Sequence, residues 1–491
     1  MSPLNRRDFL HRSLATSAAI AWPTLLSEGS ARAAEPNDEI GVGMIGAGGR
    51  AGELSKGFHG PNGAKVVAVT DPDEGRATRL AKNFDAKVYS DLHKLLEDPA
   101  VDVVVVATCN HWHCLAAIWA MQAGKDVYVE KPLSHTQWEG RQVVAAARKY
   151  KKVVQLGTQQ RSDPLQSAIK KFLHEDQALG KIHYAQANRL GQRAPIGKLD
   201  KPLEIPAGVN YDLWLGPAAD EPLYRKQFHY DWHWDWNTGS GEMGNWGVHV
   251  LDDVRNVAYQ DSVTTPKRIL AVGGRVAWDD AGNTPNCHYV YFDTGSFPTL
   301  IALSNVEAGP GKKGNWSTKG NRPFNGPSTG YLVACEGGYY AGGRGGGKAF
   351  DLEGKEIRSF KGGSMDTLHK ANFINAVRSR DWESPNAEIA IGHDSSGWCN
   401  LANVAFRAGK NFSMDEAKSI QPDFEPWNLL LGELGEHLGR FDIPLSSAEI
   451  RMSPVLHHDP KTEKFTGDHA ESANAFLKRE YRKGYEVPEI V

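Results

Sequence analysis

Two segments have residue types and spacing that suit redox chemistry at one sheet edge. One is a glycine-rich turn, Gly46-Ala47-Gly48-Gly49-Arg50-Ala51, and the other is the tripeptide Glu130-Lys131-Pro132. The turn lies between an apolar stretch, residues 39–45, and residues that can open a helix. In that context the glycines let the backbone approach a dinucleotide pyrophosphate, and the helix N-terminus offers N–H groups to it. The pattern predicts a cofactor cradle, and an ordinary glycine turn is the alternative. Its candidate contacts are Gly46, Ala47, Gly48, Gly49 and Arg50.

A carboxylate follows the next apolar stretch, residues 64–70. Asp71 has the spacing from the glycine turn at which an acidic residue accepts hydrogen bonds from the adenosine ribose. Its charge would also repel a 2′-phosphate, so NAD is favoured over NADP. A turn cap ahead of Pro72 is the alternative. Because the turn and the carboxylate occur together, the sequence predicts an NAD-binding domain.

Polar residues also follow the later apolar stretches of this region. Residues 101–107, 125–129 and 152–156 have the nearly continuous apolar character of strands covered on both faces. Open parallel sheets bind ligands beyond the carboxyl ends of their strands. The candidate cofactor contacts at these ends are Thr108, Asn110, His113, Glu130, Lys131 and Gln159.

Together with Gly247-Val248-His249-Val250-Leu251-Asp252, these segments make the chain resemble the Gfo/Idh/MocA oxidoreductases, the family of glucose–fructose oxidoreductase and inositol dehydrogenase. The resemblance covers residues 38–412. It implies an α/β fold in which a Rossmann dinucleotide-binding domain, residues 38–160, precedes an α+β domain, residues 161–412. The second domain would carry a mostly antiparallel open sheet that covers the nicotinamide and joins subunits into a homo-oligomer. Residues 413–491 lie beyond the common core as a C-terminal extension.

Mixed β-branched and polar residues predict that the second sheet has one wetter face. Its candidate strands are residues 181–190, 267–276, 287–292, 299–305 and 330–336.

Hydride transfer from a carbinol needs a group that takes the hydroxyl proton near neutral pH. Lys131 could serve, because burial lowers the pKa of an amine, whereas a solvated surface lysine is the alternative. The resemblance implies that His249 hydrogen-bonds the reacting hydroxyl with an aspartate four residues earlier; a satisfied buried histidine is the alternative. This chain has Asn245 there, and an asparagine cannot act as a base. Lys131, His249 and Asn245 are therefore the candidate catalytic residues, with the proton left to the first two.

A tryptophan-rich stretch, residues 228–236, precedes this motif. Trp232, Trp234 and Trp236 alternate with polar residues, so they would share one face of an extended chain. Aromatic faces beside hydrogen-bonding groups suit sugars, whereas a packed core or a subunit interface is the alternative. We expect a small-molecule carbohydrate as the substrate. The histidines show no tight ligand spacing, so no metal site is expected.

The N-terminal residues have the features of an export signal. Asn5-Arg6-Arg7-Asp8-Phe9-Leu10 is a twin-arginine pattern, and the small-residue site Ala31-Arg32-Ala33 follows an apolar stretch. That stretch, residues 14–26, is too short for a membrane span, so residues 1–33 are predicted to be a signal peptide for export to the periplasm. An exported enzyme would meet no maintained pool of free NAD. A tightly retained cofactor is therefore expected.

The composition fits a two-domain enzyme. The 491 residues carry a formal net charge of −3, which becomes −5 without residues 1–33. This mild acidity gives no reason to expect nucleic acid or an anionic membrane as a partner. The five cysteines are odd in number and form no C-x-x-C pattern, so no disulfide framework is expected. We expect NAD-dependent oxidation or reduction of a sugar or polyol hydroxyl. The alternatives are an NAD-dependent glycosidase and a cofactor-bearing binding protein without catalysis.

Overall fold

The computed structural model describes residues 39–314, 316, 326–420 and 423–491. The predicted signal peptide, residues 1–33, lies outside the described residues. None of the described helices is long and apolar enough to cross a membrane.

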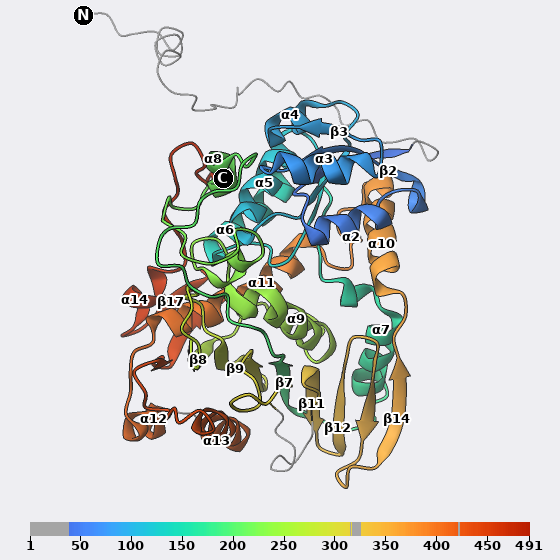
Figure 1. Ribbon diagram of the computed structural model, residues 1–491. Coiled ribbons are helices and arrows are strands. Elements are labelled where there is room, and N and C mark those ends of the chain that lie inside the picture. Colours follow the sequence, from blue (N-terminus) through green and yellow to red (C-terminus); the bar gives the residue numbers. More distant parts are fainter. Residues whose placement is uncertain (1–38, 315, 317–325, 421–422) are drawn as a thin grey trace, which may run out of the picture.

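The first domain is built on a six-stranded parallel sheet in the order β3-β2-β1-β4-β5-β6 (Figure 1). Its central strands are completely buried because helices pack on both faces, as the apolar stretches predict. The predicted Rossmann fold is confirmed. The strands are β1 (Ile40–Ile45), β2 (Ala64–Thr70), β3 (Lys87–Tyr89), β4 (Val103–Val106), β5 (Asp126–Val129) and β6 (Val154–Leu156); the helices are α2 (Gly49–Gly57), α3 (Glu74–Lys82), α4 (Leu92–Glu97), α5 (Asn110–Gln122) and α6 (Gln137–Lys149).

Helix α10 (Met365–Ser379) returns from the second domain to the first. Its Phe373 packs edge-on against Phe58 and Tyr128, with ring centroids 6.2 and 5.8 Å apart. The core of the Rossmann domain therefore includes a segment that is distant in sequence.

The second domain contains a mostly antiparallel sheet in the order β14-β13-β12-β11-β7-β10-β9-β8-β16-β17, with β15 also paired to β8. Helices α7 (Pro164–Lys170), α9 (Val248–Val257) and α11 (Ile389–Ala408) cover one face. The predicted α+β domain is confirmed. The strands are β7 (Ile182–Leu190), β8 (Arg268–Gly274), β9 (Cys287–Asp293), β10 (Pro298–Ser304), β11 (Thr329–Cys335), β12 (Gly338–Gly343), β13 (Gly346–Phe350) and β14 (Glu356–Lys361).

The C-terminal extension adds to this sheet on two sides. Strands β15 (Ile450–Met452), β16 (Leu456–Asp459) and β17 (Lys464–Thr466) lengthen its edge, and α13 (Glu425–Gly439) packs on the face opposite α9. The expected wetter face is therefore wrong for β9 and β10. Residues of both strands alternate between two apolar cores, because α13 buries the second face. The remaining helices are α8 (Tyr211–Leu215), α12 (Met414–Ile420) and α14 (Ala470–Asn474).

Candidate active site

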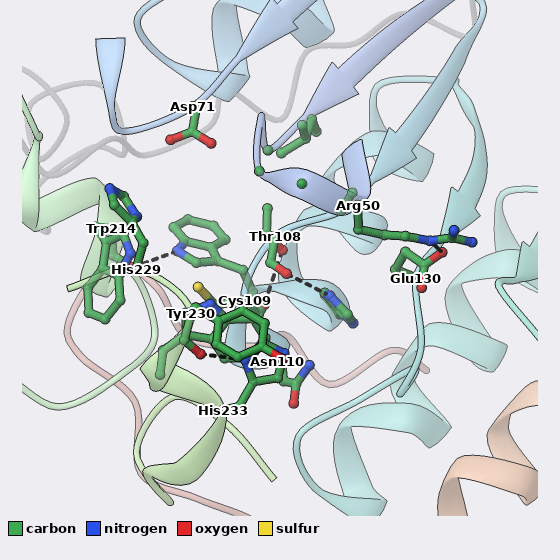
Figure 2. A pocket seen from close by; sticks show the side chains of 18 of the residues that line it. Arg50, Asp71, Thr108, Cys109, Asn110, Glu130, Trp214, His229, Tyr230 and His233 are labelled. Atoms are coloured by element: carbon green, nitrogen blue, oxygen red, sulfur yellow. Dashed lines mark hydrogen bonds and ion pairs between the residues drawn. The ribbon is translucent and has the colours of Figure 1, made fainter. Parts of the chain in front are cut away.

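A cavity of about 670 Å³ lies between the carboxyl ends of the Rossmann strands and segments of the second domain. Figure 2 shows Asp71 at one end and Arg50 with Glu130 at another. Side chains of the second domain, including Trp214 and His233, face them across the cavity. This is the sheet edge at which a parallel sheet binds its ligands.

The glycine turn forms one wall of the cavity, and its backbone requires glycine. Gly46 has φ +94, and a Cβ there would lie 2.6 Å from the carbonyl oxygen of Ala107. Helix α2 begins directly after Gly48, and among the described residues no side chain caps its N-terminus. The amides of a first helical turn have no intrahelical partners, so this end of α2 fits a pyrophosphate. Gly48, Gly49 and Arg50 line the cavity.

Asp71 ends β2 at the cavity wall, as the sequence predicts. Its carboxylate accepts the amide of Ala47 at 2.6 Å and the amide of Asp73 at 2.8 Å. Burial raises the pKa of Asp71, and these amide bonds oppose the rise. The carboxylate is thus held rigidly beside the cradle, in the position from which it could accept ribose hydroxyls. Ala47 contributes its backbone and is not a lining residue.

The loop after β4 supplies Thr108 to the cavity wall, and the first turn of α5 supplies Asn110 and His113. The two ring nitrogens of His113 lie 2.6 Å from the carbonyl oxygen of Pro132 and 3.2 Å from that of Thr108. Burial lowers the pKa of His113, so the ring is neutral and ties two cavity loops together. Gln159 is buried but is not a lining residue, and its predicted cofactor contact stays a prediction.

Lys131 brings an amine to the cavity wall at the end of β5. Its Nζ donates to the backbone oxygen of Asn245 at 2.7 Å and to the side-chain Oδ1 at 3.1 Å. Burial lowers the pKa of Lys131 to about 8, although Glu130 acts in the opposite direction. About one Lys131 side chain in ten would then be neutral at pH 7. A pKa this close to neutral pH allows an amine to exchange protons with a substrate.

Glu130 stabilises the backbone position of Lys131 and so of its amine. Arg50 Nε donates to Glu130 Oε1 at 2.8 Å, and the amide of Lys131 donates to Oε2 at 3.3 Å. Burial alone would raise the pKa of Glu130, but the cations Arg50 and Lys131 outweigh it and hold the pKa below its usual value. Glu130 is therefore an ion at neutral pH and fixes the start of the tripeptide.

The π-helical turn Met243–Gly247 brings Asn245 and Trp246 to the cavity, whereas His249 lies one turn further along, outside the cavity lining. The His249 ring packs edge-on against Trp246, with centroids 5.7 Å apart. Its buried Nδ1 has no hydrogen-bond partner among the residues that the structure describes. Burial holds the pKa of His249 well below its usual value, so the ring is neutral. The structure brings Lys131 into contact with Asn245 rather than with His249.

A buried carboxylate that the sequence reasoning missed organises the second-domain side of the cavity. Glu242 is fully buried and accepts Arg189 Nε at 2.9 Å and Arg193 Nε at 2.8 Å. It also accepts Asn245 Nδ2 at 3.1 Å. Hydrogen bonds therefore connect Lys131 through Asn245 and Glu242 to two arginines that line the cavity. The partners lie 49 and 53 residues apart, so no local pattern could have revealed them.

A long connecting segment of the second domain closes the cavity on the side of Asp71, the residue proposed to bind the adenosine ribose. It is here named the covering segment (residues 209–234). Its Val209 forms a bridge with Asp73, and His229 Nε2 lies 3.0 Å from Asp73 Oδ2. Cavity-lining residues of this segment are Leu213, Trp214, His229, Tyr230, Trp232 and His233.

The expectation that three tryptophans share one extended face is wrong. Asp231–Trp234 forms a 3₁₀ turn, so the side chains point to different surroundings. Trp232 stacks on His233 at the cavity, Trp234 is buried outside the cavity lining, and Trp236 packs on Phe406. Of these three tryptophans, Trp232 alone lines the cavity.

The C-terminal residues hold the covering segment against the Rossmann domain. Arg482 forms an ion pair with Asp212 of α8 and donates to the carbonyl oxygen of Gly216 at 3.2 Å. Tyr485 donates its hydroxyl to Asp212 at 2.8 Å, and its ring lies edge-on to Trp112, which lines the cavity. The C-terminus accordingly lies beside α8 in Figure 1.

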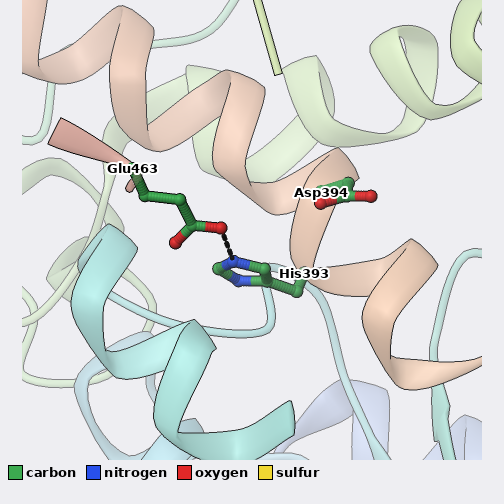
Figure 3. Close-up of side chains that lie close together, drawn as sticks. All are labelled: His393, Asp394 and Glu463. Carbon is green, nitrogen blue, oxygen red and sulfur yellow. Dashed lines mark hydrogen bonds and ion pairs between the residues drawn. The ribbon is translucent and has the colours of Figure 1, made fainter. Parts of the chain in front are cut away.

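A separate cluster, drawn in Figure 3, has residue types that bind metals, but its carboxylates are already paired with arginines. His393 Nε2 lies 2.8 Å from Glu463, which also pairs with Arg141. Asp394 pairs with Arg255 at 3.3 Å. Burial lowers the pKa of His393 to about 3. The arginines supply the positive charge that a cation would supply, so the cluster acts as a structural ion-pair network.

Two family models match the chain. Residues 40–158 match the Gfo/Idh/MocA oxidoreductase family with an NAD-binding Rossmann fold. Residues 195–300 match the C-terminal α/β domain of the same oxidoreductase family.

Inositol 2-dehydrogenase of Salmonella typhimurium (strain LT2) is 36% identical over 127 residues, which are 25% of this chain and 37% of that protein. The scyllo-inositol 2-dehydrogenase (NAD(+)) of Bacillus subtilis (strain 168) is 34% identical over 143 residues, which are 28% of this chain and 41% of that protein. The chain thus spans about two fifths of the length of the curated relatives it matches.

Solved structures share the fold over most of the chain. A levoglucosan dehydrogenase in complex with NADH and levoglucosan has a TM-score of 0.55 and 17% identity, covering 74% of this chain and 96% of that chain. The WlbA dehydrogenase from Bordetella pertussis in complex with NADH and UDP-GlcNAcA has a TM-score of 0.53 and 16% identity, covering 74% of this chain and 95% of that chain. At these identities the likeness concerns the fold.

Proposed function

We propose that the chain is a member of the Gfo/Idh/MocA oxidoreductase family, whose models match two of its regions, and that it oxidises or reduces a sugar or polyol hydroxyl with NAD. The observation that carries the proposal is the position of Lys131. Its Nζ lies at the wall of the cavity that the cofactor cradle opens into, with a pKa of about 8. The inositol dehydrogenases that match 25% and 28% of the chain support a polyhydroxylated substrate.

The residues of the chain divide the work between binding and proton transfer. NAD, when bound, supplies the hydride acceptor or donor. The uncapped start of α2 would bind its pyrophosphate, and Asp71 its adenosine ribose. Lys131 Nζ would take the hydroxyl proton during oxidation and return it during reduction. Asn245 orients the amine, and the Glu130–Arg50 pair holds its backbone.

A retained cofactor is the second part of the proposal. The covering segment bridges to Asp73 beside the adenosine site, and Arg482 with Tyr485 fastens its α8. A cofactor held beneath it would leave slowly. Together with the twin-arginine pattern, this supports a protein that is exported to the periplasm with NAD already bound, and that restores the cofactor within each cycle.

The test uses the full-length protein purified from its exporting host. We expect denaturation to release about one NAD per chain, and sugars or polyols to reduce the bound NAD, seen in its absorbance. A suitable second substrate should then sustain many turnovers without added NAD. A protein that neither contains nor binds NAD would overturn the proposal. Conversion of a glycoside with only transient reduction would instead favour the glycosidase alternative.

A further inference from the structure

The second-domain side of the cavity carries an excess of positive charge. Arg189 and Arg193 line it, Lys131 is bonded to it through Asn245, and Glu242 is the carboxylate that pairs with both arginines within the described part of the chain. Glu130 does not change this balance, because Arg50 neutralises it. The network therefore carries a net charge of about +2 when Lys131 is protonated, enclosed where water screens it weakly.

Glu242 holds the arginines in place but does not face a ligand. Its side chain is 0% exposed, whereas those of Arg189 and Arg193 are 15% and 18% exposed and line the cavity. Arg193 binds Glu242 through both Nε and Nη2, and its Nη1 donates to the hydroxyl of Tyr230 at 3.0 Å. The guanidinium of Arg189 lies over Trp246 at 4.5 Å. Both cations are thus fixed before a ligand arrives.

This wall offers hydrogen-bond donors and few acceptors. The protonated Lys131 and both arginines can only donate, and the Oδ1 of Asn245 already accepts Lys131. A neutral polyol needs acceptors for its hydroxyl hydrogens as well as donors. An anionic group needs donors alone, and fixed guanidinium groups bind carboxylates with two parallel hydrogen bonds.

We propose that the substrate is a sugar acid, a polyhydroxylated compound that carries a carboxylate. Arg189 and Arg193 bind the carboxylate, while the reacting hydroxyl lies at Lys131. The carboxylate is unchanged in the reaction: the carbinol carbon gives its hydride to NAD and the hydroxyl gives its proton to Lys131. The redox step of this assignment rests on the proposed function. The argument for an anionic substrate rests only on the charged residues of the cavity.

The test compares matched acid and neutral substrates on the NAD-loaded protein. Glucuronate is paired with glucose, gluconate with glucitol, and glucose 6-phosphate serves as the phosphate arm. We expect the carboxylates to exceed their neutral partners in kcat/KM by about ten- to a hundred-fold, the range of a charge-assisted contact. Raised ionic strength should lower kcat/KM for the acids and not for the neutral compounds.

Variants assign the effect to the arginines. Arg193→Gln and Arg189→Gln should each raise KM for the acid about ten-fold or more and change the neutral partner far less. Arg268→Gln, an exposed arginine of β8, is the matched control and should behave like the parent protein. Preference for the neutral compounds, equal losses for both substrate classes, or preference for the phosphate ester alone would overturn the assignment.

A binding measurement separates this inference from the proposed function. Glucuronate and glucose are titrated into the NADH-loaded protein, and tryptophan fluorescence reports binding. Tighter binding of glucuronate, together with no oxidation of either sugar by the NAD-loaded protein, would support the anion site and count against the proposed function. Redox turnover of neutral polyols with no preference for acids would do the reverse.

Discussion

Replacing Asn245 with aspartate should move the pH dependence of hydride transfer to higher pH. The side-chain Oδ1 of Asn245 lies 3.1 Å from Lys131 Nζ, so the variant would place a carboxylate against the amine. An opposite charge at such a distance typically shifts a pKa by about 1–3 units. The pKa of Lys131, about 8 in the parent protein, would rise because the ammonium is stabilised.

Glu242 sets the size of this shift. The Nδ2 of Asn245 donates to Glu242 Oε2 at 3.1 Å, so the new carboxylate would face a second one. Two adjacent carboxyls resist joint ionisation, and one of them binds a proton more tightly. This reduces the added charge and points to the lower end of the range, about one unit. A shift of one unit lowers the neutral fraction of Lys131 at pH 7 about ten-fold, or about 1.4 kcal/mol.

The assay is kcat/KM measured from about pH 6 to about pH 10, in both reaction directions. Oxidation needs the neutral amine, so its rate should rise through the pKa of Lys131 and then level. Reduction needs the ammonium and should fall through the same value. In Asn245→Asp both transitions should lie at higher pH, with bound NAD unchanged. Asn83→Asp, at the exposed end of α3, is the control. Profiles that superimpose on those of the parent protein would refute the role given to Lys131.

Three further outcomes test other parts of the site. Lys131→Met should keep bound NAD, measured after denaturation, while turnover falls by about two to four orders of magnitude; near-normal turnover would remove the lysine from the mechanism. Asp71→Ala should narrow the preference for NAD over NADP at least about five-fold in titrations of the apoprotein, and tighter NADP binding by the parent protein would show that the carboxylate is misassigned. Arg482→Ala removes the ion pair to Asp212 and should speed NAD release about five-fold in a displacement assay, which corresponds to about 1 kcal/mol; an unchanged rate would show that the C-terminal residues do not restrain the cofactor.

The Rossmann domain could be predicted because its signals are local. Buried parallel strands are continuous apolar stretches in the sequence. The turn at Gly46 has φ +94, a conformation that requires glycine. Asp71 and Lys131 lie at the cavity for the same reason: Asp71 directly follows β2, Lys131 comes two residues after β5, and parallel strands end at one sheet edge. Five strands of the second sheet, β7 to β11, lie close to the ranges predicted from β-branched residues between turns, whereas β12 to β17 were not predicted as strands.

The substrate side could not be predicted, because its contacts join segments that are distant in sequence. Glu242 looks like an ordinary surface residue until β7 and the loop after it bring Arg189 and Arg193 to it. The alternating tryptophans have the period of a strand, yet hydrogen bonds within the covering segment fold Asp231–Trp234 into a 3₁₀ turn. The position of His249 outside the cavity lining follows from the π-helical turn before it, which no spacing in the motif reveals.

The C-terminal extension contacts both the second sheet and the covering segment. Its α13 packs Trp427, Leu430 and Leu434 over the sheet face formed by β8, β9 and β10. The predicted homo-oligomer through this sheet stays a prediction, and α13 restricts it, because a partner subunit could reach those strands only by displacing a buried apolar core. Contacts between subunits would then fall on the part of the face nearer β14. The same extension ends in Arg482 and Tyr485 at the covering segment. The C-terminal extension, which lies beyond the family-matched regions, thus contacts both the sheet face and the covering segment. We expect changes in how it packs to affect cofactor release and subunit assembly together.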